Sequence, residues 1–249
     1  MNLTVANIST QIGAAEFQAA VRAIGRQVTE DFQPEWTLSA RLRGTALNLK
    51  SHKAPIQGHH DAIIYLGDSS QDPTTGVSGA LGYHADNHAK VPYGFVYLDI
   101  CKEYGESWTT TLSHEVLELI ADPTAVMTVT GPAPRGSGSV YFDLEVCDPT
   151  QGDSYDIDSV KVSNFVGRSY FGLTGGSGST NYLNLDLQPF GVRPNGYFQY
   201  EDHTGTHQVQ GNLVTERQLA AKRLLKTARR NARREERVSQ SLAKAATQK

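Results

Sequence analysis

Residues 113–123 read SHEVLELIADP, and this segment decides much of the fold. Its apolar residues recur at three- and four-residue spacings, which predicts a helix over residues 110–121. Pro123 disfavours helical geometry at the residue before it, so the helix is expected to end at Asp122. The segment is therefore interpreted as a helix that leads into a turn.

The polar side chains of this helix are candidates for a metal site. Positions four apart lie about 40° apart on one helix face, so His114 and Glu118 reach one point in space. Asp122 follows four residues later, and Glu115 points toward the flank of that point. The H-E-x-x-H helix of zinc hydrolases has this geometry, with its glutamate as general base on the metal-bound water. Here Glu118 takes the place of the second histidine.

An ordinary amphipathic helix with an exposed acidic face accounts for the same residues, because H-E-x-x-E recurs by chance. One feature favours a metal. Asp122 puts a negative charge at the C-terminal end of the helix, where the macrodipole disfavours it and a cation would relieve the conflict. Asp-Pro is also a common turn starter, so both interpretations stay open.

A second acidic group follows in Glu145-Val146-Cys147-Asp148-Pro149, at the end of a strand predicted over residues 139–147. Glu145 and Cys147 would share one strand face, and Asp148 would open the turn. Either carboxylate could complete a site on the helix face. Neighbouring carboxylates raise the pKa of a thiol, which favours a buried structural role for Cys147.

The remaining pattern predicts an α+β fold with a mixed, mainly antiparallel sheet. An amphipathic helix is expected over residues 11–32 and a hairpin over residues 197–210. Other strand-like runs cover residues 36–42, 62–66, 80–84, 91–100 and 160–166. The length of 249 residues fits one domain, residues 1–215, with a helical or disordered basic tail, residues 216–249.

The net charge of −3 divides unevenly along the chain. Residues 217–249 hold eleven Lys or Arg and two acids, which leaves a net charge of −12 on the preceding body. Such a body argues against nucleic-acid binding, whereas the tail could contact a partner, phosphate or a neighbouring copy. No run approaches the ~18–20 apolar residues of a membrane helix, and no secretory signal opens the chain. We expect cytoplasmic synthesis and no membrane partner.

Several blocks, in this order, resemble a group of proteins from bacterial and phage genomes. The shared blocks are QVxxDFxPxW (residues 27–36), GALGYH (79–84), SHExxExxxDP (113–123), EVCDP (145–149) and VSNFV (162–166). The group is similar to zincin metallopeptidases in its order of elements, which implies a zincin-like fold. In zincins an extended peptide pairs with an edge strand beside the metal helix, and Gly79–His84 would be that edge.

The resemblance implies a metal-dependent hydrolase acting on peptide bonds. The implied roles are His114 and Glu118 as ligands, Glu145, Asp148 or Asp122 as the third ligand, Glu115 as general base, and His84 as oxyanion stabiliser. Because Glu118 replaces a histidine, the site would be more anionic than in zincins. The sequence therefore leaves open whether the site binds zinc, calcium, manganese or no metal. The alternative is a non-catalytic, phage-derived structural or interaction protein, associated with a virion, that uses the basic tail to contact a partner.

Overall fold

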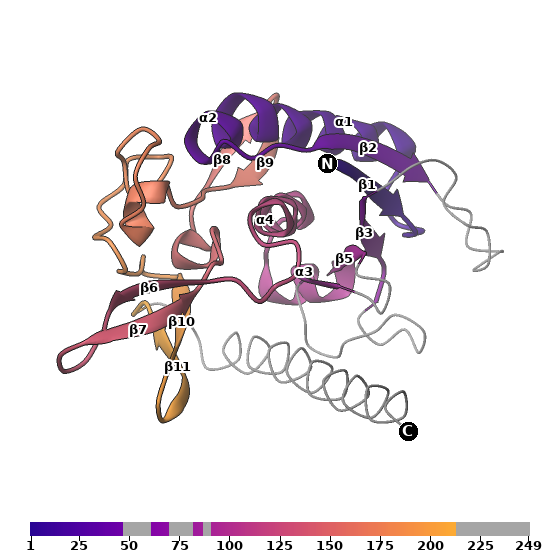
Figure 1. Cartoon of the computed structure of the whole chain (residues 1–249). Helices are drawn as coiled ribbons and strands as arrows, with labels where there is room; N and C mark the ends of the chain where they lie inside the picture. The colour runs from indigo at the N-terminus through magenta and orange to yellow at the C-terminus, as the bar shows by residue number, and fades with distance from the viewer. Residues whose placement is uncertain (47–60, 70–81, 87–90, 213–249) are drawn as a thin grey trace, which may run out of the picture.

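The computed structural model describes residues 1–46, 61–69, 82–86 and 91–212 (Figure 1). The helical elements are α1 (Ala14–Arg26), the π-helix η1 (Gln27–Phe32), α2 (Gln33–Trp36), α3 (Leu98–Tyr104), α4 (Trp108–Ala121), and the 3-10 helices η3 (Asp148–Thr150) and η4 (Arg168–Phe171). The strands are β1 (Asn2–Asn7), β2 (Arg41–Ala46), β3 (Ala62–Gly67), β4 (Gly82–Asp86), β5 (Pro92–Tyr97), β6 (Thr128–Pro132), β7 (Ser139–Asp143), β8 (Ser154–Ile157), β9 (Val160–Ser163), β10 (Tyr197–Asp202) and β11 (Gly205–Gln210).

A five-stranded sheet has the order β2-β1-β3-β5-β4. The pairs β1–β2, β1–β3 and β3–β5 are parallel, and only β4 runs antiparallel, beside β5 at the edge. The expectation of a mainly antiparallel sheet is therefore wrong here, although the mixed α+β class is confirmed. The helical stretch from α1 to α2 carries the chain from β1 to β2, and such a crossover returns the chain in the parallel direction.

The second sheet is antiparallel, with the order β11-β10-β7-β6, and β8 and β9 form a separate hairpin. The hairpin expected over residues 197–210 is confirmed as β10–β11. The strand expected over residues 139–147 ends at Asp143, so Glu145 and Cys147 do not share a strand face. Similarly, the run over residues 91–100 ends as a strand at Tyr97 and continues as α3.

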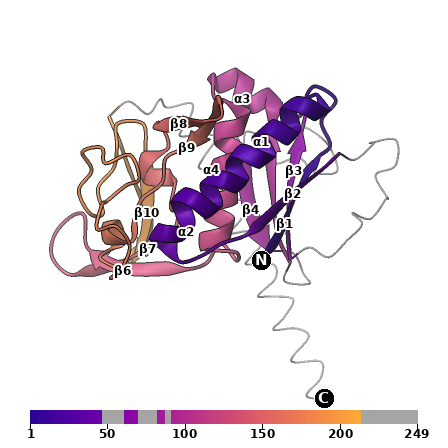
Figure 2. The same ribbon diagram turned by 90° about the horizontal axis from the view of Figure 1, so that it is seen from above.

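Helix α4 lies in the middle of the molecule, with the five-stranded sheet on one side and the second sheet on the other (Figures 1 and 2). It packs against β9, β5 and β4. Every side chain from Leu112 to Ala121 is buried, including His114, Glu115 and Glu118. A helix enclosed on all sides belongs to the interior, so the interpretation as an exposed acidic face is wrong.

None of the described helices is long and apolar enough to cross a membrane. The basic tail and residues 79–81 of the expected edge lie outside the described residues. The backbone of His84 is described as part of β4, opposite Gly94 of β5, but its side chain is not.

Candidate metal centre

A buried hydrogen-bond network holds the N-terminal half of α4 in place. The Ser113 hydroxyl donates to the Gln27 amide oxygen over 2.6 Å and accepts the Ser163 N–H over 3.0 Å. The Gln27 amide nitrogen donates in turn to the Ser163 carbonyl over 2.8 Å. Helix α4, the π-helix η1 and strand β9 are thus joined one residue before His114.

The structure brings His114, Glu118 and Asp148 together. The His114 Nε2 atom lies 3.2 Å from Glu118 Oε1 and 3.3 Å from Asp148 Oδ1. The first distance follows from the four-residue spacing on α4. The second depends on tertiary folding, because Asp148 opens the 3-10 helix η3.

The segment between β7 and η3 passes close beside α4 as irregular backbone. Its position is set by backbone pairing, since Val166 N donates to the Val146 carbonyl over 2.7 Å and Leu144 N donates to the Met127 carbonyl over 3.0 Å. Cys147 N donates to Glu118 Oε1 over 3.2 Å. After β7 ends at Asp143, the bonds to Val166 and Glu118 hold this segment beside α4.

The protonation of these groups reflects the crowding of acids around one imidazole. Burial lowers the pKa of His114, but Glu118 and Asp148 outweigh this effect and raise the pKa well above the usual value. The pKa of Glu118 is raised to about 8, mainly because the side chain is buried. The charge of His114 opposes this shift, and the charges of Glu145 and Asp148 add to it. Both His114 and Glu118 therefore hold their protons more tightly than the free side chains do.

Cys147 lies in the same cluster. The Sγ atom of Cys147, a ligand nitrogen of His114 and a carboxylate oxygen of Glu118 all lie within 4.8 Å of one another. These three buried side chains have the donor types and the spacing to bind a metal ion. Burial raises the pKa of the Cys147 thiol well above its usual value, and Glu118 adds to the shift, as the sequence pattern predicts.

Tyr197 is a member of the cluster that sequence reasoning missed. It begins β10, is buried, and donates a hydrogen bond from its hydroxyl to the Asp148 carboxylate. Burial raises its pKa well above the usual value, and the Asp148 and Glu118 charges add to the effect. No pattern around Tyr197 indicates this role, because the second sheet alone brings it to α4.

Asp122 is directed into its own turn. Its carboxylate accepts hydrogen bonds from Thr124 N over 3.2 Å, Thr124 Oγ1 over 3.0 Å and Met127 N over 2.7 Å. These donors stabilise the negative charge at the helix end, which is the turn-starting role considered for Asp-Pro.

Two other expected site residues, Glu145 and Glu115, act electrostatically on the cluster. Glu145 is buried, and its charge raises the pKa of Glu118. Glu115 is buried, and its charge raises the pKa of the Cys147 thiol. His84 lies on β4, which packs against α4.

Comparison of the chain with protein-family models, with curated proteins and with solved structures found no match. The function is therefore inferred from the geometry and chemistry of the site.

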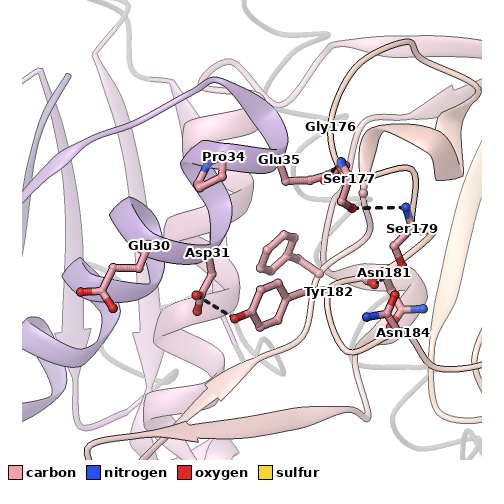
Figure 3. Close-up of a pocket in the computed structure, with 12 residues that line it drawn as sticks. Glu30, Asp31, Pro34, Glu35, Gly176, Ser177, Ser179, Asn181, Tyr182 and Asn184 are labelled. Atoms are coloured by element: carbon pink, nitrogen blue, oxygen red, sulfur yellow. Dashed lines mark hydrogen bonds between the residues drawn. The ribbon is translucent and has the colours of Figure 1, made fainter.

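A separate recess of about 500 Å³ lies between η1, α2 and the loop over residues 176–184 (Figure 3). The Asp31 carboxylate accepts hydrogen bonds from the hydroxyls of Tyr182, over 2.8 Å, and Tyr155, over 2.6 Å. The Glu35 carboxylate accepts the Ser177 and Arg168 backbone N–H groups over 2.6 and 2.8 Å. Both acids thus hold neighbouring segments together, which gives them a structural role.

Proposed function

We propose that this protein is a metal-dependent hydrolase that acts on extended peptides. The metal would be held by His114, by Glu118 and by one donor of the segment over residues 145–148. Among the carboxylates considered from the sequence, Asp148 is the best placed, since it lies 3.3 Å from His114 Nε2. Asp122 is less suitable because its carboxylate is engaged by Thr124 and Met127.

The convergence of two buried carboxylates on one imidazole nitrogen is the observation that carries the proposal. Around His114 the structure buries the carboxylates of Glu115, Glu118, Glu145 and Asp148. Buried charges are usually paired or coordinate metals. Here the pairing is through His114, whose Nε2 atom faces both Glu118 and Asp148. A divalent cation held by the same donors would stabilise their deprotonated forms.

The distances fit such an ion. Ligands of tetrahedral zinc bind about 2.0–2.3 Å from the metal and therefore stand roughly 3.3–3.8 Å from one another. The Nε2 atom of His114 lies 3.2 and 3.3 Å from the oxygens of Glu118 and Asp148. When bound, the metal would polarise the peptide carbonyl and the attacking water.

Glu115 is the proposed general base. It follows His114 on α4, is buried, and lies near enough to Cys147 for its charge to raise the thiol pKa. Glu115 would take up the proton of the attacking water and return it to the leaving amine. His84 would stabilise the oxyanion from β4.

The substrate would bind along β4. Within the part of the chain that the structure describes, this strand is the edge of the five-stranded sheet, pairs with β5, and packs against α4. An extended peptide could add to such an edge through backbone hydrogen bonds, which would place it alongside the helix that carries His114. The resemblance to zincins supports the same mode of binding.

The decisive variant is Glu115→Gln, assayed with a library of fluorogenic peptides after loading with Zn²⁺. Loss of a general base lowers kcat by about 10²–10⁴-fold. Metal content and unfolding midpoint should stay the same as in the wild-type protein. Glu103→Gln, an exposed acid on α3, is the matched control and should keep full activity. Full hydrolysis by Glu115→Gln would rule out this mechanism.

A non-catalytic role is the second candidate, and the burial of the site favours it. Glu118 is 3% exposed and Asp148 2%, as is common for structural metal sites enclosed by protein. In that case the metal, or the proton-bridged cluster itself, would hold α4 to the segment over residues 145–148. Bound metal without hydrolysis of any peptide in the library would support this function over the hydrolase.

A further inference from the structure

We infer that Cys147 is the third protein ligand of the proposed metal, through its thiolate. The site would then select zinc and similar ions over calcium, magnesium and manganese. This inference rests on the proposed metal binding and assigns the donor that the sequence pattern leaves open.

Position is the first argument. The ligand atoms of His114, Glu118 and Cys147 lie within 4.8 Å of one another. Small side-chain adjustments bring three such atoms to the roughly 3.3–3.8 Å separations of zinc ligands. The three residues come from α4 and from the segment before η3, so a bound ion would join the two.

The surroundings of the thiol are the second argument. Cys147 is 0% exposed, and its backbone N–H donates to the ligand oxygen Oε1 of Glu118. The Ser163 hydroxyl is in hydrogen-bonding contact with the thiol. Partners of this kind, outside the ligands themselves, orient metal ligands and fix their direction.

The number of ligands is the third argument. With His114, Glu118 and Cys147 bound, a tetrahedral ion keeps one position for water or substrate, as catalytic zinc sites require. Asp148 then remains the acceptor of the Tyr197 hydroxyl. Because thiolates are soft ligands, the set of one nitrogen, one oxygen and one sulfur excludes calcium and magnesium, which prefer oxygen alone.

The chain offers a matched control, since Cys101 is its one other cysteine. Cys101 is also buried, but its thiol contacts Thr111 at 3.6 Å and belongs to α3. Replacing either cysteine by serine thus removes one buried thiol, and only one of the two replacements removes the inferred ligand.

The test is titration of the full-length metal-free protein with Co²⁺, followed by absorption spectroscopy and calorimetry. A thiolate bound to cobalt gives a charge-transfer band in the near ultraviolet, which nitrogen and oxygen ligands do not give. We expect this band in the wild-type protein and in Cys101→Ser, and its loss in Cys147→Ser. Cobalt binding without the band in the wild-type protein, or a band retained by Cys147→Ser, would overturn the role of Cys147 and leave the proposed metal intact. Absence of any binding would overturn both.

X-ray absorption at the zinc edge on the wild-type protein gives a second readout that does not depend on the folding of a variant. One sulfur neighbour at about 2.3 Å is expected beside the nitrogen and oxygen ligands. A shell of nitrogen and oxygen alone would refute the inference.

Discussion

The Nε2 atom of His114 lies 3.3 Å from the Oδ1 atom of Asp148, which joins the central helix α4 to the 3-10 helix η3. The Oε1 atom of Glu118 lies 3.2 Å from the same His114 nitrogen. One imidazole therefore faces two carboxylates in the interior, and the raised pKa values of His114 and Glu118 follow from this arrangement. The protons that these groups retain are the ones a metal ion would displace.

Metal affinity should rise with pH. Ligands bind metals in their deprotonated form, and each proton released on binding raises the apparent affinity about tenfold per pH unit below the pKa of the group. Since the pKa of Glu118 is about 8, the affinity for Zn²⁺ should increase steadily up to that pH. Calorimetric titrations in buffers of different ionisation enthalpy measure the number of protons released. A pH-independent affinity, with no proton release, would contradict this prediction.

The metal-free protein should lose stability as the pH rises. The pKa of Glu118 is raised from 4.5 to about 8 on folding, so between these values the folded state binds more protons than the unfolded state. The raised pKa of His114 also lowers the stability as the pH rises above 6.5. Each extra proton lowers the free energy of unfolding by roughly 1.4 kcal/mol per pH unit. Urea unfolding in the presence of a chelator should show this decline, and Glu118→Gln should flatten it.

Ser113→Ala should destabilise the protein by about 1–3 kcal/mol, because it leaves the buried Gln27 oxygen and the Ser163 N–H without their partner. Thr29→Ala is the control, since Thr29 is exposed and its hydroxyl donates to the Gly25 and Arg26 carbonyls of the preceding helical turn. The control should change the free energy of unfolding by less than about 0.5 kcal/mol. Equal effects of the two substitutions in urea unfolding would show that the Ser113 network contributes little.

Gly176→Ala should be more damaging than Gly178→Ala. Both residues have positive φ angles, +74° and +82°, so both variants bear the conformational cost of an L-residue in this region. Only at position 176 would the added Cβ collide with the Glu35 carboxylate, whereas nothing lies within 4 Å of it at position 178. The difference in unfolding free energy isolates the contact with Glu35. Hydrogen exchange of Ser177 N–H, which donates to Glu35, should accelerate only in Gly176→Ala.

Local patterns in the sequence determined the elements whose information lies within a few residues. The helix expected over residues 110–121 is α4, and its four-residue spacing placed His114 beside Glu118 correctly. The hairpin of β10 and β11 followed from its turn residues and flanking strands. Each of these features depends on a helical or strand period that is visible in a short window.

Tertiary structure alone decided the parallel sheet and the completed cluster. β1, which the sequence pattern did not reveal, lies between β2 and β3 because distant segments of the chain pair with it. Cys147, Asp148 and Tyr197 reach His114 from another loop and another sheet, and hydrogen bonds to Val146 rather than a strand period set the path of the loop. Such contacts join residues far apart in the chain, so no local period encodes them. The sequence therefore determined which helix carries the candidate site, and the packing of the sheets around that helix decided which side chains surround it.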